Sequence, residues 1–147
     1  MIADNFQAFE DKIERQVLRN LDAAGFFLVS QIRPMISTPS RTVSHVPRFK
    51  GDQLVGMKKV LGPRGSNRSK PGEPPHKDYG RLRASIARET VPNGSSPRCF
   101  VGSALPHAKF LELGTVKMAA RPFLRRALGE NQQRITEIVT TGFQRTN

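Results

Sequence analysis

The sequence is short of the residues that build covalent cross-links, aromatic platforms and membrane spans. Cys99 is the only cysteine, so no disulfide can form within the chain, and its apolar neighbours predict a buried, inert thiol in a strand. Tryptophan is absent and tyrosine occurs once, which leaves little surface on which unpaired bases could stack. No apolar run approaches the ~20 residues of a membrane-spanning helix, and the N-terminus lacks the pattern of a signal peptide. We therefore expect no membrane contact.

Acidic residues are also scarce. The chain has 12 Asp and Glu against 24 Lys and Arg, which gives a formal net charge of +12 and an attraction to polyanions. This surplus fits contact with nucleic acid or with an acidic protein neighbour, and it fits equally well a solvated surface that keeps the chain in solution. Charge alone leaves these alternatives open.

The residue patterns that carry chemistry are missing as well. The histidines, His45, His76 and His107, are scattered, and no pair has the spacing of metal ligands. The sequence contains no Gly-rich phosphate loop, no nucleophile elbow and no evident pair of carboxylates. We predict a protein that is not an enzyme and that uses neither a metal nor a cofactor.

What is present begins with a long amphipathic helix, predicted from about Asp4 to Arg33 and ended by Pro34. At 1.5 Å per residue it would be about 45 Å long, more than a small domain needs for its own core. Gly25 and the Phe26-Phe27 pair indicate either a bend or a second face that meets a neighbour. The apolar residues recur at three- and four-residue steps: Phe6, Phe9, Ile13, Val17, Leu21, Ala24, Leu28 and Ile32.

The helical periodicity stops between about residues 34 and 77, where most of the prolines and many glycines lie. We predict an extended Pro/Gly-rich basic loop here, with only Asp52–Leu61 apolar enough to form a short helix or strand. The basic residues of this loop are candidates for contact with DNA or with a partner protein: Arg41, Arg48, Lys50, Lys58, Lys59, Arg64, Arg68 and Lys70.

The remainder predicts a small antiparallel β-sheet with a short helix, followed by a C-terminal helix. The chain as a whole, residues 1–147, is expected to form a single α+β domain with a long insertion. The expected elements are a helical turn at Gly80–Ile86 that leads into a strand to Val91, a turn at Asn93-Gly94, a strand from Arg98 to Gly102, a helix from Pro106 to Leu113, a short strand from Thr115 to Met118 and a last helix from Pro122 through Val139, weakened near Gly129 and Asn131.

Two stretches resemble the hallmark of a phage protein family. The first is His107–Leu128, with Glu112-Leu113-Gly114-Thr115 and Ala120-Arg121-Pro122-Phe123-Leu124; the second is Pro71-Gly72-Glu73-Pro74-Pro75 followed by Gly80-Arg81-Leu82-Arg83-Ala84-Ser85-Ile86. With the N-terminal helix they are similar to the neck, tail-completion or head–tail joining family of tailed siphophages, named after the tenth gene product of a lambdoid phage. His107 and Tyr79 replace the family's usual tyrosine and threonine, and the basic loop is longer than in the family.

The resemblance implies a structural virion protein of the head–tail junction, assembled in the host cytoplasm. Such a protein would form a homo-oligomeric ring, hexameric rather than dodecameric, around the DNA channel and join the connector to the tail. Its partners would be connector, tail-terminator or tail-tube proteins, with genomic DNA in the channel as a further contact. Two alternatives stay open: a free-standing basic nucleic-acid-binding protein, and a tail-terminator subunit of the same apparatus.

Elementary chemistry gives the motif a structural meaning as well. Gly114 permits a positive φ at the end of a helix, and Thr115 can bond the turned backbone. Pro122 suits the first turn of the last helix, which Phe123 would anchor on the sheet. Glu112 and Arg121 are candidates for an ion pair, within the chain or across a subunit boundary. The same motif residues are also the candidates for contact with neighbouring subunits: Glu112, Gly114, Thr115, Arg121, Pro122 and Phe123.

Overall fold

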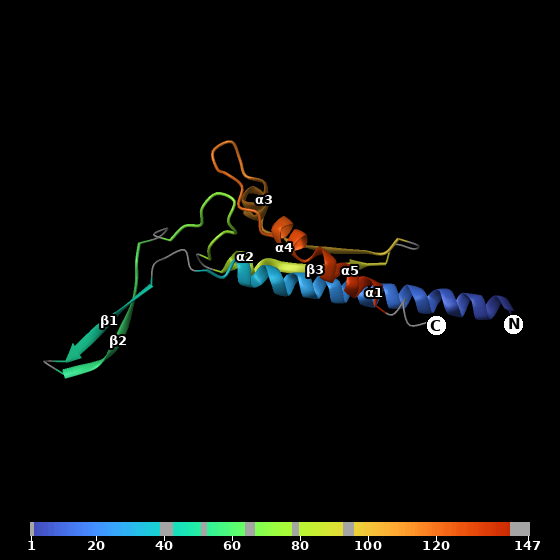
Figure 1. Ribbon diagram of the computed structural model, residues 1–147, viewed down its shortest axis with the longest axis horizontal. Helices are drawn as coiled ribbons and strands as arrows, with labels where there is room; N and C mark the ends of the chain where they lie inside the picture. The colour runs from blue at the N-terminus through green and yellow to red at the C-terminus, as the bar shows by residue number, and fades with distance from the viewer. Residues whose placement is uncertain are drawn as a thin grey trace.

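The computed structural model describes residues 2–38, 43–50, 53–63, 67–77, 80–92 and 96–141. It confirms the α+β class predicted from the sequence. A long helix, α1 (Ile2–Met35), forms the spine of an elongated molecule (Figure 1). It is followed by β1 (Val43–Lys50), β2 (Gln53–Leu61), α2 (Arg81–Ser85), β3 (Ile86–Val91), β4 (Arg98–Ser103), α3 (Pro106–Leu113), α4 (Leu124–Glu130) and α5 (Gln132–Thr140).

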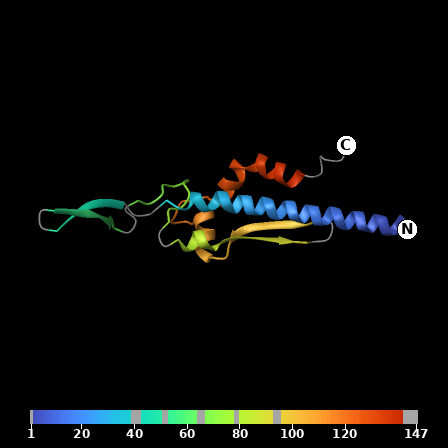
Figure 2. The ribbon, with the colours of Figure 1, turned by 90° about the horizontal axis from the view of Figure 1, so that it is seen from below.

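Helix α1 confirms the periodicity of the sequence, but it takes Pro34 into its last turn and ends at Met35. Proline has no N–H, so Pro34 removes one intrahelical hydrogen bond. The loss is tolerated because the helix ends one residue later, at Met35. Of the two alternatives given for this region, the bend is wrong, since α1 is straight over its whole length in both views (Figures 1 and 2).

Three layers make up the body of the molecule. Helix α1 lies between the β3–β4 hairpin on one side and α5 on the other (Figure 2). The strands pair antiparallel from Ile86 opposite Ser103 to Val91 opposite Arg98, as the sequence predicts. The Asn93-Gly94 turn that would join them lies outside the described residues.

The core is small and sits against the C-terminal half of α1. The buried cluster consists of Val29, Ile32, Ile36, Ile86, Ala108, Phe123 and Ala127. Toward the other end of the same helix, Phe6 and Phe9 are 63% and 58% exposed. The apolar stripe of α1 is therefore longer than the core that covers it.

The predicted single C-terminal helix is wrong in its continuity. The chain breaks at Asn131 into α4 and α5, and the Asn131 side chain donates a hydrogen bond to the carbonyl of Ala127 (2.8 Å). Helix α5 is tied to α1 by buried Asn20, whose Nδ2 donates to the carbonyls of Val139 (2.9 Å) and Thr141 (2.7 Å). These bonds satisfy acceptors that a helix end leaves without an intrahelical donor.

The strand over residues 53–61 confirms one of the two forms expected for Asp52–Leu61, whereas residues 43–50 correct the prediction of an irregular loop. Apart from the turn residues 51–52, which are not described, residues 43–61 form a β-hairpin, β1–β2, with Val43 opposite Leu61 and Lys50 opposite Gln53. The register shifts between Arg48 and Phe49, next to Gly56 with its φ of 147°. The hairpin projects from the body as an arm (Figure 1), and every one of its residues whose side chain is described is exposed.

A surface cluster attaches β3 to α1. The guanidinium of Arg88 donates two hydrogen bonds to the carboxylate of Asp22 (3.0 and 2.9 Å) and lies over the ring of Phe26, 5.2 Å from its centroid. The Thr90 hydroxyl donates a third bond to the same carboxylate (3.3 Å). The bonds from Arg88 hold the pKa of Asp22 below its ordinary value. The Asp22 carboxylate in turn raises the pKa of Arg88.

The close approach of α1 and β4 yields a first prediction. A Cβ added at Gly25 would lie 2.5 Å from Sγ of Cys99, so Gly25→Ala should lower the free energy of unfolding by about 1–3 kcal/mol. Adding Cys99→Ala should recover part of the loss. The matched control is Gly129→Ala in α4, which meets nothing within 4 Å and should raise stability by about 0.5–1 kcal/mol. Equal effects of the two glycine substitutions in urea unfolding would contradict this packing.

The Asp22–Arg88 pair yields a second prediction, on pH. Because the pKa of Asp22 is lowered by folding, its contribution is present at neutral pH and is lost as the pH falls through the lowered pKa. Asp22→Asn should therefore be less stable than the parent protein at neutral pH, with the difference closing in acid. In an Arg88→Gln background the same substitution should have a much smaller pH-dependent effect, because only the bond from Thr90 still favours the Asp22 carboxylate. A difference in urea midpoint that stays constant with pH would refute the assignment.

Candidate functional site

Glu112, in α3, closes the N-terminal end of α4. Its Oε2 accepts hydrogen bonds from the backbone N–H groups of Phe123 (2.8 Å) and Leu124 (3.0 Å), and its Oε1 accepts one from Arg125 (2.8 Å). No side chain of α4's own flanking residues performs this role. A carboxylate is well suited to it, because the first N–H groups of a helix lack partners and carry partial positive charge.

The ion pair expected between Glu112 and Arg121 within the chain is therefore wrong. Both oxygens of the carboxylate accept hydrogen bonds from backbone N–H groups at the start of α4. Arg121 is held through its backbone instead, since its N–H donates to the carbonyl of Leu111 (2.7 Å). A pair across a subunit boundary remains a prediction. The sequence could not show that three backbone donors compete with the guanidinium for this carboxylate.

Gly114 and Thr115 form the tight turn that leads from α3 toward α4. Gly114 has a φ of 77°, and an added Cβ would lie 2.8 Å from the backbone nitrogen of Ala120, so the predicted need for glycine is confirmed. The expected strand from Thr115 is only a single bridge to Met118. The Thr115 hydroxyl accepts a hydrogen bond from the backbone of Lys117 (3.3 Å), which confirms its predicted role in the turn.

Pro122 does not start the last helix as predicted, because α4 begins two residues later, at Leu124. Phe123 is the anchor that the sequence suggests: its side chain is 0% exposed and belongs to the buried cluster together with residues of α1 and β3. The cap by Glu112 and the burial of Phe123 thus act on neighbouring positions and fix where α4 begins.

The two motif stretches meet in space. The backbone N–H of Gly72, which has a φ of 82°, donates to the carbonyl of Ala120 (2.9 Å). Pro75, three residues on, is buried. This contact brings the segment before α2 against the segment before α4, although the two are far apart in the sequence.

The basic residues proposed from the sequence separate into two groups. Arg48, Lys50, Lys58 and Lys59 are exposed on the hairpin arm, whereas Arg68 and Lys70 lie in the segment that returns to the body. Arg41 and Arg64 lie outside the described residues.

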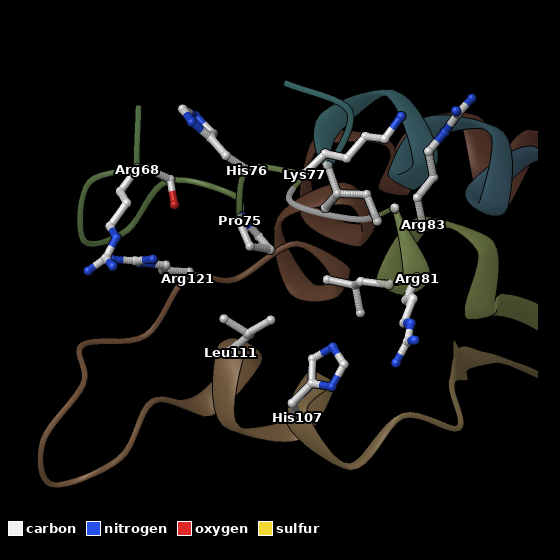
Figure 3. Close-up of a pocket in the computed structure, with 13 residues that line it drawn as sticks. Arg68, Pro75, His76, Lys77, Arg81, Arg83, His107, Leu111 and Arg121 are labelled. Atoms are coloured by element: carbon white, nitrogen blue, oxygen red, sulfur yellow. The ribbon is translucent and has the colours of Figure 1, made fainter. Parts of the chain in front are cut away.

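A cavity of about 310 Å³ lies where the two motif stretches meet (Figure 3). Arg68 and Arg121, chosen from the sequence for different reasons, both line it and lie at the same side of it in this view. Sequence reasoning missed the other polar residues of the lining, because nothing in their spacing shows that they converge. The lining residues are Ile36, Arg68, Ser69, Pro75, His76, Lys77, Gly80, Arg81, Leu82, Arg83, His107, Leu111 and Arg121.

Two polar atoms of this lining are buried without a hydrogen-bond partner: Oγ of Ser69 and Nε of Arg121. A buried polar atom left unpaired costs about 1–3 kcal/mol. The lining also carries five Arg and Lys side chains and no Asp or Glu, and none of the five forms an ion pair within the described part of the chain. This cavity is therefore strongly electropositive.

Two further findings concern the described ranges only. No group of His, Cys, Asp and Glu residues there is arranged to hold a metal ion. Among the same residues, none of the helices combines the length and apolarity that crossing a bilayer requires.

Comparisons with known proteins add no relative to this picture: a scan against protein families, a search of curated proteins and a search of solved structures each gave no match.

The cap on α4 yields a third prediction. Glu112→Gln should lower the free energy of unfolding by about 2 kcal/mol, because the amide has one neutral acceptor oxygen where the carboxylate has two charged ones. The matched control is Glu130→Gln on the same helix, whose carboxylate forms a half-exposed ion pair with Arg126 (2.7 Å) and should matter by less than about 0.5 kcal/mol. Chemical denaturation measures both, and equal losses would contradict the capping role.

Proposed function

We propose that the protein is a structural subunit of a tailed-phage head–tail junction, assembled in the host cytoplasm, that forms a closed ring around the DNA channel and joins the connector to the tail. The observation that carries the proposal is the exposed β1–β2 arm. The resemblance of the two motif stretches to the head–tail joining family supplies the identity of the assembly, and the surfaces of the protomer support assembly as its role.

The described side chains of the arm form no core of their own. Val46, Val55, Met57, Val60 and Leu61 on it are all exposed, Met57 by 61%. A two-stranded hairpin by itself is marginally stable in water, and exposed apolar surface of this kind marks protein contact sites. The arm is expected to be completed by a neighbouring subunit or by another virion protein.

Two other apolar surfaces lack a cover in the protomer. One is the N-terminal part of α1, with Phe6, Phe9 and Ile13 exposed. The other is the turn between α3 and α4, which projects from the body (Figure 1) and carries fully exposed Val116. The arm and the free end of α1 lie at opposite ends of the long axis (Figure 1). Contact between unlike surfaces of identical subunits produces rings when the rotation closes.

A second candidate function, DNA binding by the free protein, is favoured by one feature of the same arm. A two-stranded β-ribbon fits the major groove of B-DNA, and this ribbon carries Arg48, Lys50, Lys58 and Lys59 on exposed positions. This function predicts binding by the monomer, with an affinity that falls steeply with salt. A tail-terminator subunit is a third candidate, and it differs from the first in the ring that it contacts.

Removal of the arm tests the proposal. Because Val43 and Leu61 are paired across the hairpin, residues 44–60 can be replaced by a diglycine linker at the base of the arm. The shortened protein should keep its melting temperature, since every removed residue whose side chain is described is exposed. It should lose ring assembly and the ability to complement a phage that lacks the protein. Unchanged assembly and infectivity would refute the proposal.

A charge-only variant separates the two leading functions. Lys58→Gln with Lys59→Gln leaves the apolar residues of the arm in place and removes two cations. If the arm binds protein, the double variant should still assemble and complement. If the arm binds DNA, the variant should lose about two units of the salt dependence of binding and fail in function.

A further inference from the structure

The cavity between the two motif stretches has features that the assembly role does not explain. Its lining contains Arg68, Lys77, Arg81, Arg83 and Arg121 without a single carboxylate. Like charges gathered around one concave space repel one another unless an anion lies among them. Asp78, the nearest acid in the sequence to Lys77, lies outside the described residues.

The two unpaired polar atoms point to the same kind of ligand. Ser69 is 4% exposed, and its hydroxyl oxygen has no partner; the buried Nε–H of Arg121 is a donor without an acceptor. Both residues line the cavity. An oxyanion placed there would accept from both groups and from the guanidinium of Arg68, which lies at the same side of the cavity in Figure 3.

The rest of the wall decides what carries the anion. Besides its cations, the cavity is lined by the apolar residues Ile36, Pro75, Leu82 and Leu111. A volume of about 310 Å³ admits one or two side chains and is far too small for a DNA duplex. A phosphate of the DNA backbone would reach the rim but would leave the apolar residues uncovered. A carboxylate on an aliphatic stem fills both parts.

We propose that this cavity is a binding site for an acidic peptide segment of a partner protein, with a carboxylate held by Arg68, Ser69 and Arg121 and an aliphatic side chain against Leu111. The site would give the basic body of the protein a specific acidic neighbour, separate from the contacts of the hairpin arm. Its test uses the purified chain in any oligomeric state, so failure of this proposal and failure of the ring are distinguishable.

The experiment measures calorimetric binding of a short capped peptide of alternating leucine and glutamate at physiological salt. We expect binding that weakens at least about tenfold with Arg68→Gln and with Arg121→Gln, as loss of one charge-assisted bond implies. Arg125→Gln, an equal charge change on an exposed residue outside the cavity, should leave binding unchanged. The matching leucine–glutamine peptide should bind at least about tenfold more weakly.

Three results would overturn the proposal: no binding of the acidic peptide, equal effects of all three arginine substitutions, or displacement of the peptide by duplex DNA with the same dependence on Arg68 and Arg121. Free glutarate that binds as tightly as the peptide would also overturn it, in favour of a small-molecule site. Arg68 is exposed, so its variant remains informative if Arg121→Gln fails to fold as judged by circular dichroism.

Discussion

The apolar face on the C-terminal half of α1 is the surface on which the rest of the body depends. Ile32 in this helix and Ile36 just after it are almost fully buried. Ile86 of β3, Ala108 of α3 and Phe123, which precedes α4, belong to the same cluster. Phe123 can occupy this core only if α4 begins beside it, which the carboxylate of Glu112 ensures by accepting the N–H groups of the first turn. A single packing surface and one cap therefore determine the arrangement of the segments that resemble the phage motif.

The same constraint leaves much of the chain without a core. The buried cluster uses only part of α1, and the exposed phenylalanines near its other end have no cover within the protomer. The β1–β2 arm buries none of its described side chains. Apolar surface of this extent is costly in water, and association is the usual way in which proteins remove it. This surplus supports the proposal that the protein is a ring subunit, and the resemblance of its motifs supplies the proposed kind of ring.

The sequence predicts those elements whose pattern reflects burial on one side. The period of α1, the β3–β4 pair and the glycine at the end of α3 were predicted because each has a core face or a required φ. In the arm, the strand β2 was one of the two forms expected for Asp52–Leu61. The segment of β1 was predicted as loop because its described side chains have no buried face that would show as alternation, and Pro47 within it argued against a strand. The Glu112 cap and the basic cavity were missed for another reason: both depend on residues that only the tertiary fold brings together, such as Arg68 and Arg121.

The most direct test of the central claim is the mass of the purified full-length protein, measured by light scattering at low and high salt, with and without DNA. The account predicts a discrete closed oligomer whose mass persists in high salt, because apolar contacts between subunits are not screened, and which does not require DNA. A protein that stays monomeric at every salt concentration and changes mass only when DNA is added would contradict it.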